Sequence, residues 1–142
     1  MIVLAGRNLA KMEAAKAELD ELGVESCLCK TDIADRAQVQ ALADYAASLG
    51  DVTQVIHTSG VSPSDTATEN IMKINAAGTV NMVETFYPVL AEGGVMINFS
   101  SVAAYTMPQT DEWTQVFEAW NEPDFYDRLL ALIWPKPCPR SL

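Results

Sequence analysis

Short apolar runs alternate along the chain with longer stretches in which apolar residues recur every three or four positions. The apolar runs are bounded by glycine or polar residues, and runs of four to seven residues with such boundaries predict buried β-strands. The predicted strands cover residues 2–5, 24–30, 52–57 and 95–99.

The stretches between these runs have the apolar spacing of amphipathic helices. Asn8 and Asp35 can cap the first two helices, because their side chains can accept hydrogen bonds from backbone amides of the first turn. A third, longer helix is predicted over 71–90. Glycines mark the two helix ends and a turn before the last strand: Gly23, Gly50, Gly93 and Gly94.

The strict alternation of strands and helices predicts an α/β fold. Apolar strands this short favour a doubly wound parallel sheet with helices on both faces and right-handed crossovers. In such sheets, ligands bind at the carboxyl ends of the strands.

The pattern changes after Ser101. Residues 109–133 are acidic and aromatic with weak helical spacing, and we interpret them as an insertion or a lid. Residues 134–142 carry three prolines at every second position and no acid, which predicts a disordered tail.

Length, charge and composition argue against several classes of function. The 142 residues suit one globular domain, and the formal net charge of -10 disfavours a nucleic acid partner. No metal site is predicted, because the three cysteines form no CxxC motif and His57 is the only histidine that could complete a ligand set. The cysteines are Cys27, Cys29 and Cys138. No apolar run approaches the roughly 20 residues of a membrane span. We therefore expect no export signal, no membrane partner and a reducing cytoplasm.

Two strand ends carry residues that suit a nucleotide. An acid after the second strand of a dinucleotide-binding fold binds the ribose of NAD, whereas an arginine accommodates the 2′-phosphate of NADP, and Arg7 occupies such a position. Arg7 can equally be an ordinary solvated side chain. Asp32 can accept a hydrogen bond from the adenine amino group, with Ile33 against the ring. Alternatively, Asp32 and Asp35 only cap the next helix, a task for which Asp35 is better placed.

The end of the third strand is built from small residues. Thr58, Ser59 and Gly60 would let the backbone approach a cofactor, although Ser59-Gly60 can also be a simple turn. His57 is more often structural than catalytic in such a position.

Polar residues also occur where local structure does not favour them. Asn75 lies in the middle of a predicted helix, where asparagine is unfavourable, so another requirement must keep it there. Ser100 and Ser101 end the last strand, and either hydroxyl could polarise a carbonyl oxygen or simply belong to a loop.

In this order and spacing, the segments resemble the short-chain dehydrogenase/reductase family over roughly residues 1–108, matching its second to fifth strands. The resemblance implies a partial Rossmann-type NAD(P)-binding domain in which Ser101 is the catalytic serine and Asn75 holds a proton-relay water. The segments that carry it are Gly6-Arg7-Asn8, Asp32-Ile33, His57-Thr58-Ser59-Gly60 in place of Asn-Asn-Ala-Gly, Asn75, and Asn98-Phe99-Ser100-Ser101. The cofactor-binding residues it implies are Arg7, Asn8, Asp32, Ile33, Thr58, Ser59 and Gly60.

The resemblance implies hydride transfer between a carbonyl or alcohol substrate and a nicotinamide cofactor. Arg7 favours NADP(H) over NAD(H) as that cofactor. The full-length enzyme is expected to form homo-oligomers. Two family motifs are not found in these residues. The glycine-rich phosphate loop of the family precedes its second strand. The Tyr-x-x-x-Lys pair is not found either, because the residue four positions after Tyr105 is Gln109 and the residue four positions after Tyr126 is Leu130. We therefore expect a family fragment that is inactive by itself.

Two other functions remain open. The first is a non-catalytic α/β interaction protein that uses the acidic aromatic segment as its contact surface. The second is a flavodoxin-like or response-regulator domain, which has the right length but lacks the acidic cluster at the first strand's end and leaves Asn75 and Ser101 unexplained.

Overall fold

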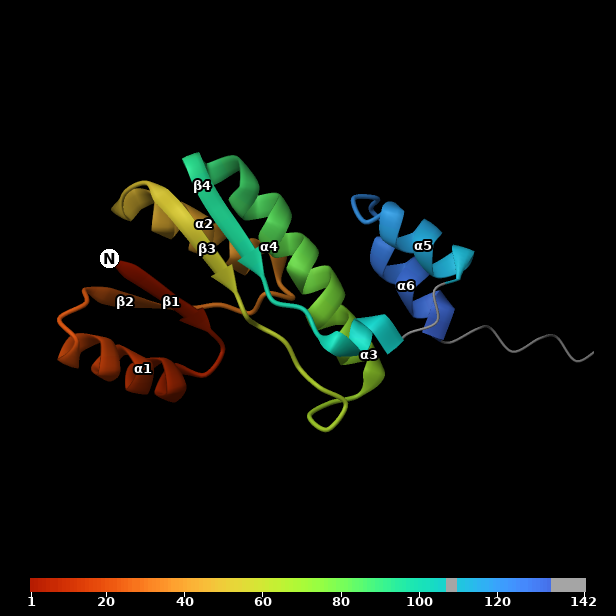
Figure 1. The fold of residues 1–142 in the computed structure, drawn as a ribbon, viewed down its shortest axis with the longest axis horizontal. Helices are drawn as coiled ribbons and strands as arrows, with labels where there is room; N and C mark the ends of the chain where they lie inside the picture. The colour runs from red at the N-terminus through yellow and green to blue at the C-terminus, as the bar shows by residue number, and fades with distance from the viewer. Residues whose placement is uncertain (107–109, 134–142) are drawn as a thin grey trace, which may run out of the picture.

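The computed structural model describes residues 1–106 and 110–133, so the tail predicted at 134–142 lies outside the described residues. In these residues the structure has four strands and six α-helices, and strands and helices alternate as far as β4 (Figure 1). The strands are β1 (Ile2–Gly6), β2 (Ser26–Lys30), β3 (Val52–His57) and β4 (Leu90–Asn98). The helices are α1 (Leu9–Glu21), α2 (Arg36–Leu49), α3 (Thr68–Ile71), α4 (Gly78–Phe86), α5 (Asp111–Glu118) and α6 (Phe125–Ile133).

The helix boundaries follow from local chemistry. The side chain of Asn8 accepts a hydrogen bond from the Lys11 amide at 3.1 Å, and Asp35 accepts from the amides of Ala37 and Gln38 at 3.0 and 3.2 Å. Both predicted caps are therefore confirmed. Gly23 follows α1 with φ 72, a conformation that glycine adopts without strain.

The third predicted helix differs from the expectation of a regular helix over 71–90. Helical structure begins at Thr68, passes through a π-helical turn at Met72–Ala77 and ends in a 3₁₀ turn at Tyr87–Val89. Such π-turns insert an extra residue and occur often at functional sites.

The predicted turn at Gly93-Gly94 is wrong, since both glycines lie inside β4. Gly93 has φ 77, and a Cβ on Gly94 would lie 3.1 Å from the carbonyl oxygen of Thr53 on β3. The glycines thus accommodate the irregular pairing near the start of β3, where the register shifts between Val52 and Gln54.

The predicted α/β class with parallel strands is confirmed, but the strands form two separate pairs. β1 pairs in parallel with β2, and β3 pairs in parallel with β4, with no ladder joining the two pairs. Figure 1 shows α1 beside the β1–β2 pair, and α2 and α4 behind β3 and β4. The sheet is therefore divided between β1 and β3.

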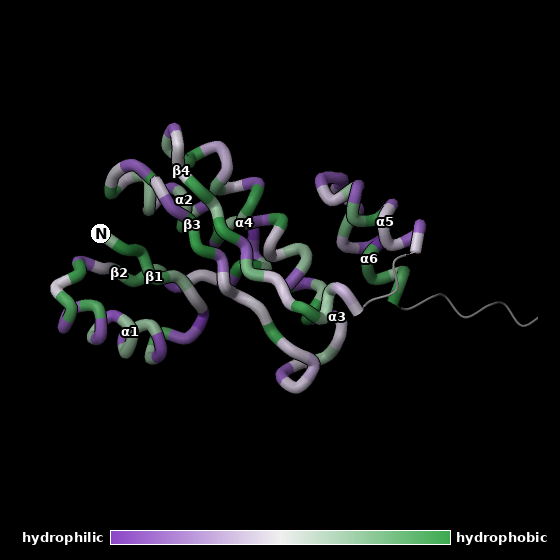
Figure 2. The backbone as a smooth tube through the Cα atoms, viewed as in Figure 1, coloured by the Kyte–Doolittle hydropathy of each residue, from purple (hydrophilic) through white to green (hydrophobic). Residues whose placement is uncertain are grey.

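The core lies between β3, α2 and α4. In Figure 2 the hydrophobic colour follows β1 and β4, while the turns of α1 and α5 carry hydrophilic segments. The opposite face of the β3–β4 pair is uncovered, because Ile56, Val95 and Ile97 are 60%, 45% and 47% exposed. The buried core residues are Ile33, Val39, Leu42, Ala43, Val55, Ile74, Met82 and Phe86.

The acidic aromatic segment forms the hairpin of α5 and α6. Helix α6 packs on the π-helical turn and buries Phe125 and Leu129. The rings of Trp113 and Phe117 stack with centroids 5.9 Å apart, and Phe117 contacts Phe125 at 6.3 Å. The hairpin is thus attached to the domain, and its role as an insertion, a lid or an interface stays a prediction.

Candidate functional site

One cavity of the described residues lies where β3 and β4 end. It has a volume of about 470 Å³ and brings together Thr58, Gly60, Asn75 and Ser101, which are distant in sequence. Ser59 lines the neighbouring larger cavity instead. Four of the residues predicted from the sequence therefore line one cavity at the carboxyl ends of parallel strands. The complete lining is Thr58, Gly60, Val61, Ser62, Asp65, Asn75, Phe99, Ser100 and Ser101.

Asn75 anchors the loop that follows β3. Its side-chain Oδ1 accepts a hydrogen bond from the Val61 amide at 2.9 Å, and its Nδ2 donates to the Val61 carbonyl at 2.8 Å. One asparagine thus satisfies both backbone groups of a loop residue, which requires one donor and one acceptor on the same side chain. This requirement explains an asparagine inside a helix.

The backbone carbonyl of Asn75 belongs to a second chain of hydrogen bonds. The Thr79 hydroxyl donates to it at 2.7 Å, and His57 Nε2 lies 3.1 Å from the same hydroxyl oxygen. Because the threonine proton is used on Asn75, Nε2 of His57 must carry a hydrogen and donate it to Thr79.

His57 is 4% exposed, and burial lowers the pKa of its imidazole. The ring is therefore neutral at neutral pH, with the hydrogen on Nε2. The interpretation of His57 as a structural histidine agrees with this geometry. Its partner Thr79 was not predicted, because a threonine one helical turn after Asn75 carries no motif of its own.

Ser101 stands at the entrance of a 3₁₀ turn, Val102–Thr106. Its Oγ accepts a hydrogen bond from the Ala103 amide at 3.2 Å, which leaves the hydroxyl proton available for donation. Ser100 lines the same cavity. A hydroxyl donor at this position can stabilise negative charge that develops on a bound oxygen.

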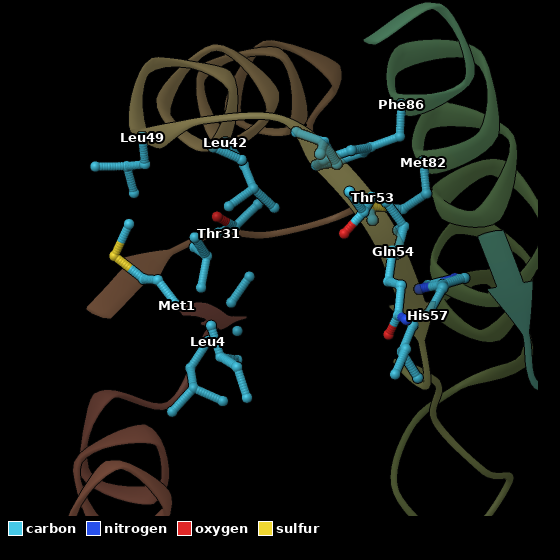
Figure 3. A pocket seen from close by; sticks show the side chains of 18 of the residues that line it. Met1, Leu4, Thr31, Leu42, Leu49, Thr53, Gln54, His57, Met82 and Phe86 are labelled. Atoms are coloured by element: carbon cyan, nitrogen blue, oxygen red, sulfur yellow. The ribbon is translucent and has the colours of Figure 1, made fainter. Parts of the chain in front are cut away.

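The larger cavity, of about 630 Å³, separates β1 from β3. Figure 3 shows Met1, Leu4 and Leu49 on one side and Gln54, His57 and Met82 on the other, facing across open space. At the carboxyl ends of the strands this cavity is lined by Gly6, Thr31, Ile33, Thr58 and Ser59. It therefore opens at the sheet edge where the predicted cofactor-binding residues lie.

Arg7 and Asp32 follow two neighbouring strands at that edge, since β1 and β2 pair Gly6 with Lys30. Arg7 is exposed directly after β1. Asp32 Oδ1 accepts a hydrogen bond from the Ala34 amide at 3.0 Å, so one carboxylate oxygen is engaged in its own turn. The other oxygen has no hydrogen bond to the described residues.

Asn8 and Ile33 each have a structural task. Asn8 caps α1, and Ile33 is buried with its side chain against Gly78, where an added Cβ would lie 2.9 Å from Ile33 Cδ1. Their contacts with a cofactor stay predictions. Within residues 1–106 and 110–133, no cluster of three metal-ligating side chains occurs. The described part of the chain also contains no helix long and apolar enough to cross a bilayer.

The sequence model of the short chain dehydrogenase family matches residues 1–112. The chain is 29% identical over 108 residues to the short-chain dehydrogenase/reductase bsc3 of Alternaria brassicicola, in an alignment that covers 76% of this chain and 39% of that protein. It is 27% identical over 109 residues to carbonyl reductase (NADPH) 3 of Homo sapiens, covering 71% of this chain and 39% of the reductase. The chain thus spans about two-fifths of the length of these relatives.

Solved structures share the arrangement. The apo form of LigD from Sphingobium sp. strain SYK-6 superimposes with a TM-score of 0.66 at 27% identity, covering 75% of this chain and 50% of LigD. A short-chain dehydrogenase/reductase from Burkholderia phymatum in complex with NAD gives a TM-score of 0.66 at 23% identity, covering 92% of this chain and 47% of that one. The predicted Rossmann-type fold is confirmed by this likeness.

Proposed function

Because the chain belongs to the short-chain dehydrogenase family, whose sequence model matches residues 1–112, we propose that residues 1–108 form the nucleotide-binding part of an NADP(H)-dependent oxidoreductase. Its reaction transfers a hydride between the nicotinamide and the carbon of a small carbonyl or alcohol substrate, while a proton moves on the substrate oxygen. The relatives are oxidoreductases by name, which supports the reaction class.

One observation carries this proposal: Ser101 and Asn75 line the same cavity, with Thr58 and Gly60 on its wall. In the proposed function, the Ser101 hydroxyl donates a hydrogen bond to the substrate oxygen, where negative charge develops as hydride arrives. Asn75 holds a water that moves the proton. Thr58 and Gly60 form the side of the cavity nearest the cofactor.

The preference for NADP(H) is proposed from Arg7. The residue follows β1 directly, is exposed and has no acid beside it in the segment Gly6-Arg7-Asn8, so a 2′-phosphate would meet a cation rather than a carboxylate. The name of the human relative includes NADPH, whereas the Burkholderia phymatum structure contains NAD. The family therefore uses both cofactors, and Arg7 is the feature of this chain that favours one.

We also propose that these 142 residues do not turn over substrate without further residues. Tyr126 donates to the Glu69 carbonyl, and burial together with the nearby Glu69 and Asp127 carboxylates raises the pKa of its phenol, which opposes proton exchange at neutral pH. Tyr105 is 90% exposed and has no lysine four residues later. Cytoplasmic location and homo-oligomer formation also stay predictions, as does use of the acidic aromatic hairpin as a contact surface.

The test uses two small nucleotides that need only the adenosine end of the site. Adenosine 2′,5′-bisphosphate and adenosine 5′-monophosphate are titrated into the 142-residue chain by isothermal calorimetry. We expect the 2′-phosphate to improve affinity about 10- to 100-fold, the effect of a charge-assisted hydrogen bond of about 1.5–3 kcal/mol.

Arg7→Ala should remove this difference. Arg128→Ala is the matched control, because it removes the same charge from α6, where Arg128 pairs with Asp124. Equal affinity for the two nucleotides in the unmodified chain, or an equal loss in both variants, would contradict a role of Arg7 in cofactor choice.

A further inference from the structure

The two cysteines of β2 lie on one face of that strand. Cys27 and Cys29 are two positions apart, and successive side chains of a strand point to opposite faces, so both sulfurs lie on the same side. The residues paired with them on β1 are Val3 and Ala5, whose side chains lie on that side too. Two free, half-buried thiols are thus neighbours on one surface, flanked by small apolar groups.

Each thiol has a hydroxyl group beside it. A hydrogen bond between Tyr45 of α2 and Cys27 raises the pKa of the Tyr45 phenol, and charge on Cys27 and Cys29 adds to this effect. Thr31 Oγ lies 3.6 Å from Cys29 Sγ and also donates to the Cys29 carbonyl at 3.2 Å. Hydroxyl donors stabilise sulfur in the thiolate form, which is the form that binds metal ions. The pair therefore has the surroundings of a ligand set.

The spacing along the strand limits what the two sulfurs can do. Side chains two positions apart have Cβ atoms about 6.6 Å apart, because a strand rises about 3.3 Å per residue. A disulfide needs about 3.5–4.5 Å between these atoms, so Cys27 and Cys29 cannot be bridged without moving the backbone. Two sulfurs on opposite sides of one metal ion, each at about 2.3 Å, lie about 4.6 Å apart. Each sulfur then leans only about 1 Å toward the other, which the strand allows.

The number of ligands determines which ion fits. Zinc takes four ligands in structural sites, and within residues 1–106 and 110–133 no third histidine, cysteine or carboxylate completes a cluster with the pair. Calcium and magnesium require oxygen ligands. Soft thiolates select Cu(I), a monovalent ion that two sulfurs can hold in a linear arrangement. A soft monovalent cation therefore matches both the spacing and the number of the ligands.

We propose that Cys27 and Cys29 form a two-coordinate Cu(I) site on the face of β2 that is directed toward Tyr45 of α2. Binding replaces the two thiol protons by the ion, and Tyr45 donates its hydrogen bond to the bound Cys27 sulfur. The ion enters from solvent, since both cysteines are only half-buried and Tyr45 is 38% exposed. Neither cysteine lines the two cavities, so the site is separate from the proposed oxidoreductase function.

The experiment titrates the reduced 142-residue chain with Cu(I) under nitrogen, in competition with the coloured chelator bathocuproine disulfonate. We expect one ion per chain. A second thiolate on the same strand improves affinity about 10²- to 10⁴-fold over a single thiol, so Cys27→Ser and Cys29→Ser should each weaken binding about 100-fold or more. Tyr45→Phe should weaken it about five- to tenfold, by the loss of one hydrogen bond. Cys138→Ser is the matched control, because it removes a thiol outside β2, and it should leave the affinity unchanged.

Alkylation of the unmodified chain gives a second readout that does not depend on the folding of any variant. The chain is treated with iodoacetamide with and without Cu(I), and the modified cysteines are identified by mass spectrometry of its peptides. Bound Cu(I) should protect Cys27 and Cys29 together and leave Cys138 reactive. Zn(II) at the same concentration should protect neither cysteine of β2, because it lacks the further ligands that it needs.

Three results would overturn the proposal. One is an unchanged affinity for Cu(I) in Cys27→Ser or Cys29→Ser, together with equal alkylation of both cysteines in the presence and absence of the ion. Another is loss of binding in Cys138→Ser or protection of Cys138, which assigns the ion to a different pair of sulfurs. The third is a complex of two chains per ion in sedimentation, because each chain would then supply a single thiolate.

Discussion

Replacing Asn75 tests whether the loop after β3 is held by the helix below it. Asn75→Ala removes two hydrogen bonds, from the Val61 amide at 2.9 Å and to the Val61 carbonyl at 2.8 Å. Each contributes about 1 kcal/mol net, and alanine recovers about 0.5 kcal/mol of helix propensity. We expect the free energy of unfolding to fall by about 1.5 kcal/mol.

Asn75→Asp is the sharper variant, because it is nearly the same size. Its carboxylate can still accept from the Val61 amide, but the second oxygen would face the Val61 carbonyl in place of the Nδ2 donor. Two acceptors then oppose each other, so at neutral pH this variant should be at least as unstable as Asn75→Ala. Protonation of the aspartate carboxylate restores a donor. The loss of unfolding free energy in Asn75→Asp, relative to the unmodified chain, should therefore become smaller as the pH falls through the carboxyl pKa.

The measurement is urea denaturation of the three proteins between pH 7 and pH 4, with amide exchange of Val61 as the local readout. The Asn75→Ala deficit should not change with pH, because that variant introduces no titrating group. Equal stability of Asn75→Ala and the unmodified chain, or an aspartate deficit that grows on acidification, would refute the assignment of Asn75 as the anchor of this loop.

Two further predictions concern the packing and protonation around the same site. A Cβ on Gly78 would lie 2.9 Å from Ile33 Cδ1. Gly78→Ala should therefore lower the free energy of unfolding by about 1 kcal/mol, after the higher helix propensity of alanine is taken into account. Ile33→Val removes that methyl group, and denaturation of the double variant should show a smaller loss than the sum of the single variants. His57 is the only histidine, and burial lowers its pKa. The unfolded chain therefore binds more protons below about pH 6.5, so stability should fall as pH drops from 7 to 5. His57→Asn should flatten this dependence in denaturation curves, and an unchanged slope would contradict it.

The elements of the fold were predictable because their signals are local. Capping by Asn8 and Asp35 depends on residues within three positions, and the apolar runs of β1 and β3 show strand formation directly. The start of β4 was not predictable in the same way. Leu90 and the glycines at 93 and 94 are typical of a helix end and a turn, and they become strand only because β3 lies alongside to pair with them.

The site was predictable to the extent that its residues occupy strand ends. Thr58, Gly60 and Ser101 follow β3 and β4 and meet because parallel strands end at one edge of the sheet. The contacts of Asn75 and His57 were not predictable, since each depends on a single distant partner: Val61 for the amide of Asn75, and Thr79 for the imidazole of His57.

The division of the sheet links the two cavities. An apolar run predicts a strand but does not say which strands flank it, because pairing depends on residues far apart in the sequence. Thr58 lines both cavities, and Ile56, two residues earlier in β3, lines the larger one. The two cavities therefore meet at Thr58, directly after β3, so the loop that begins there contributes to the lining of both.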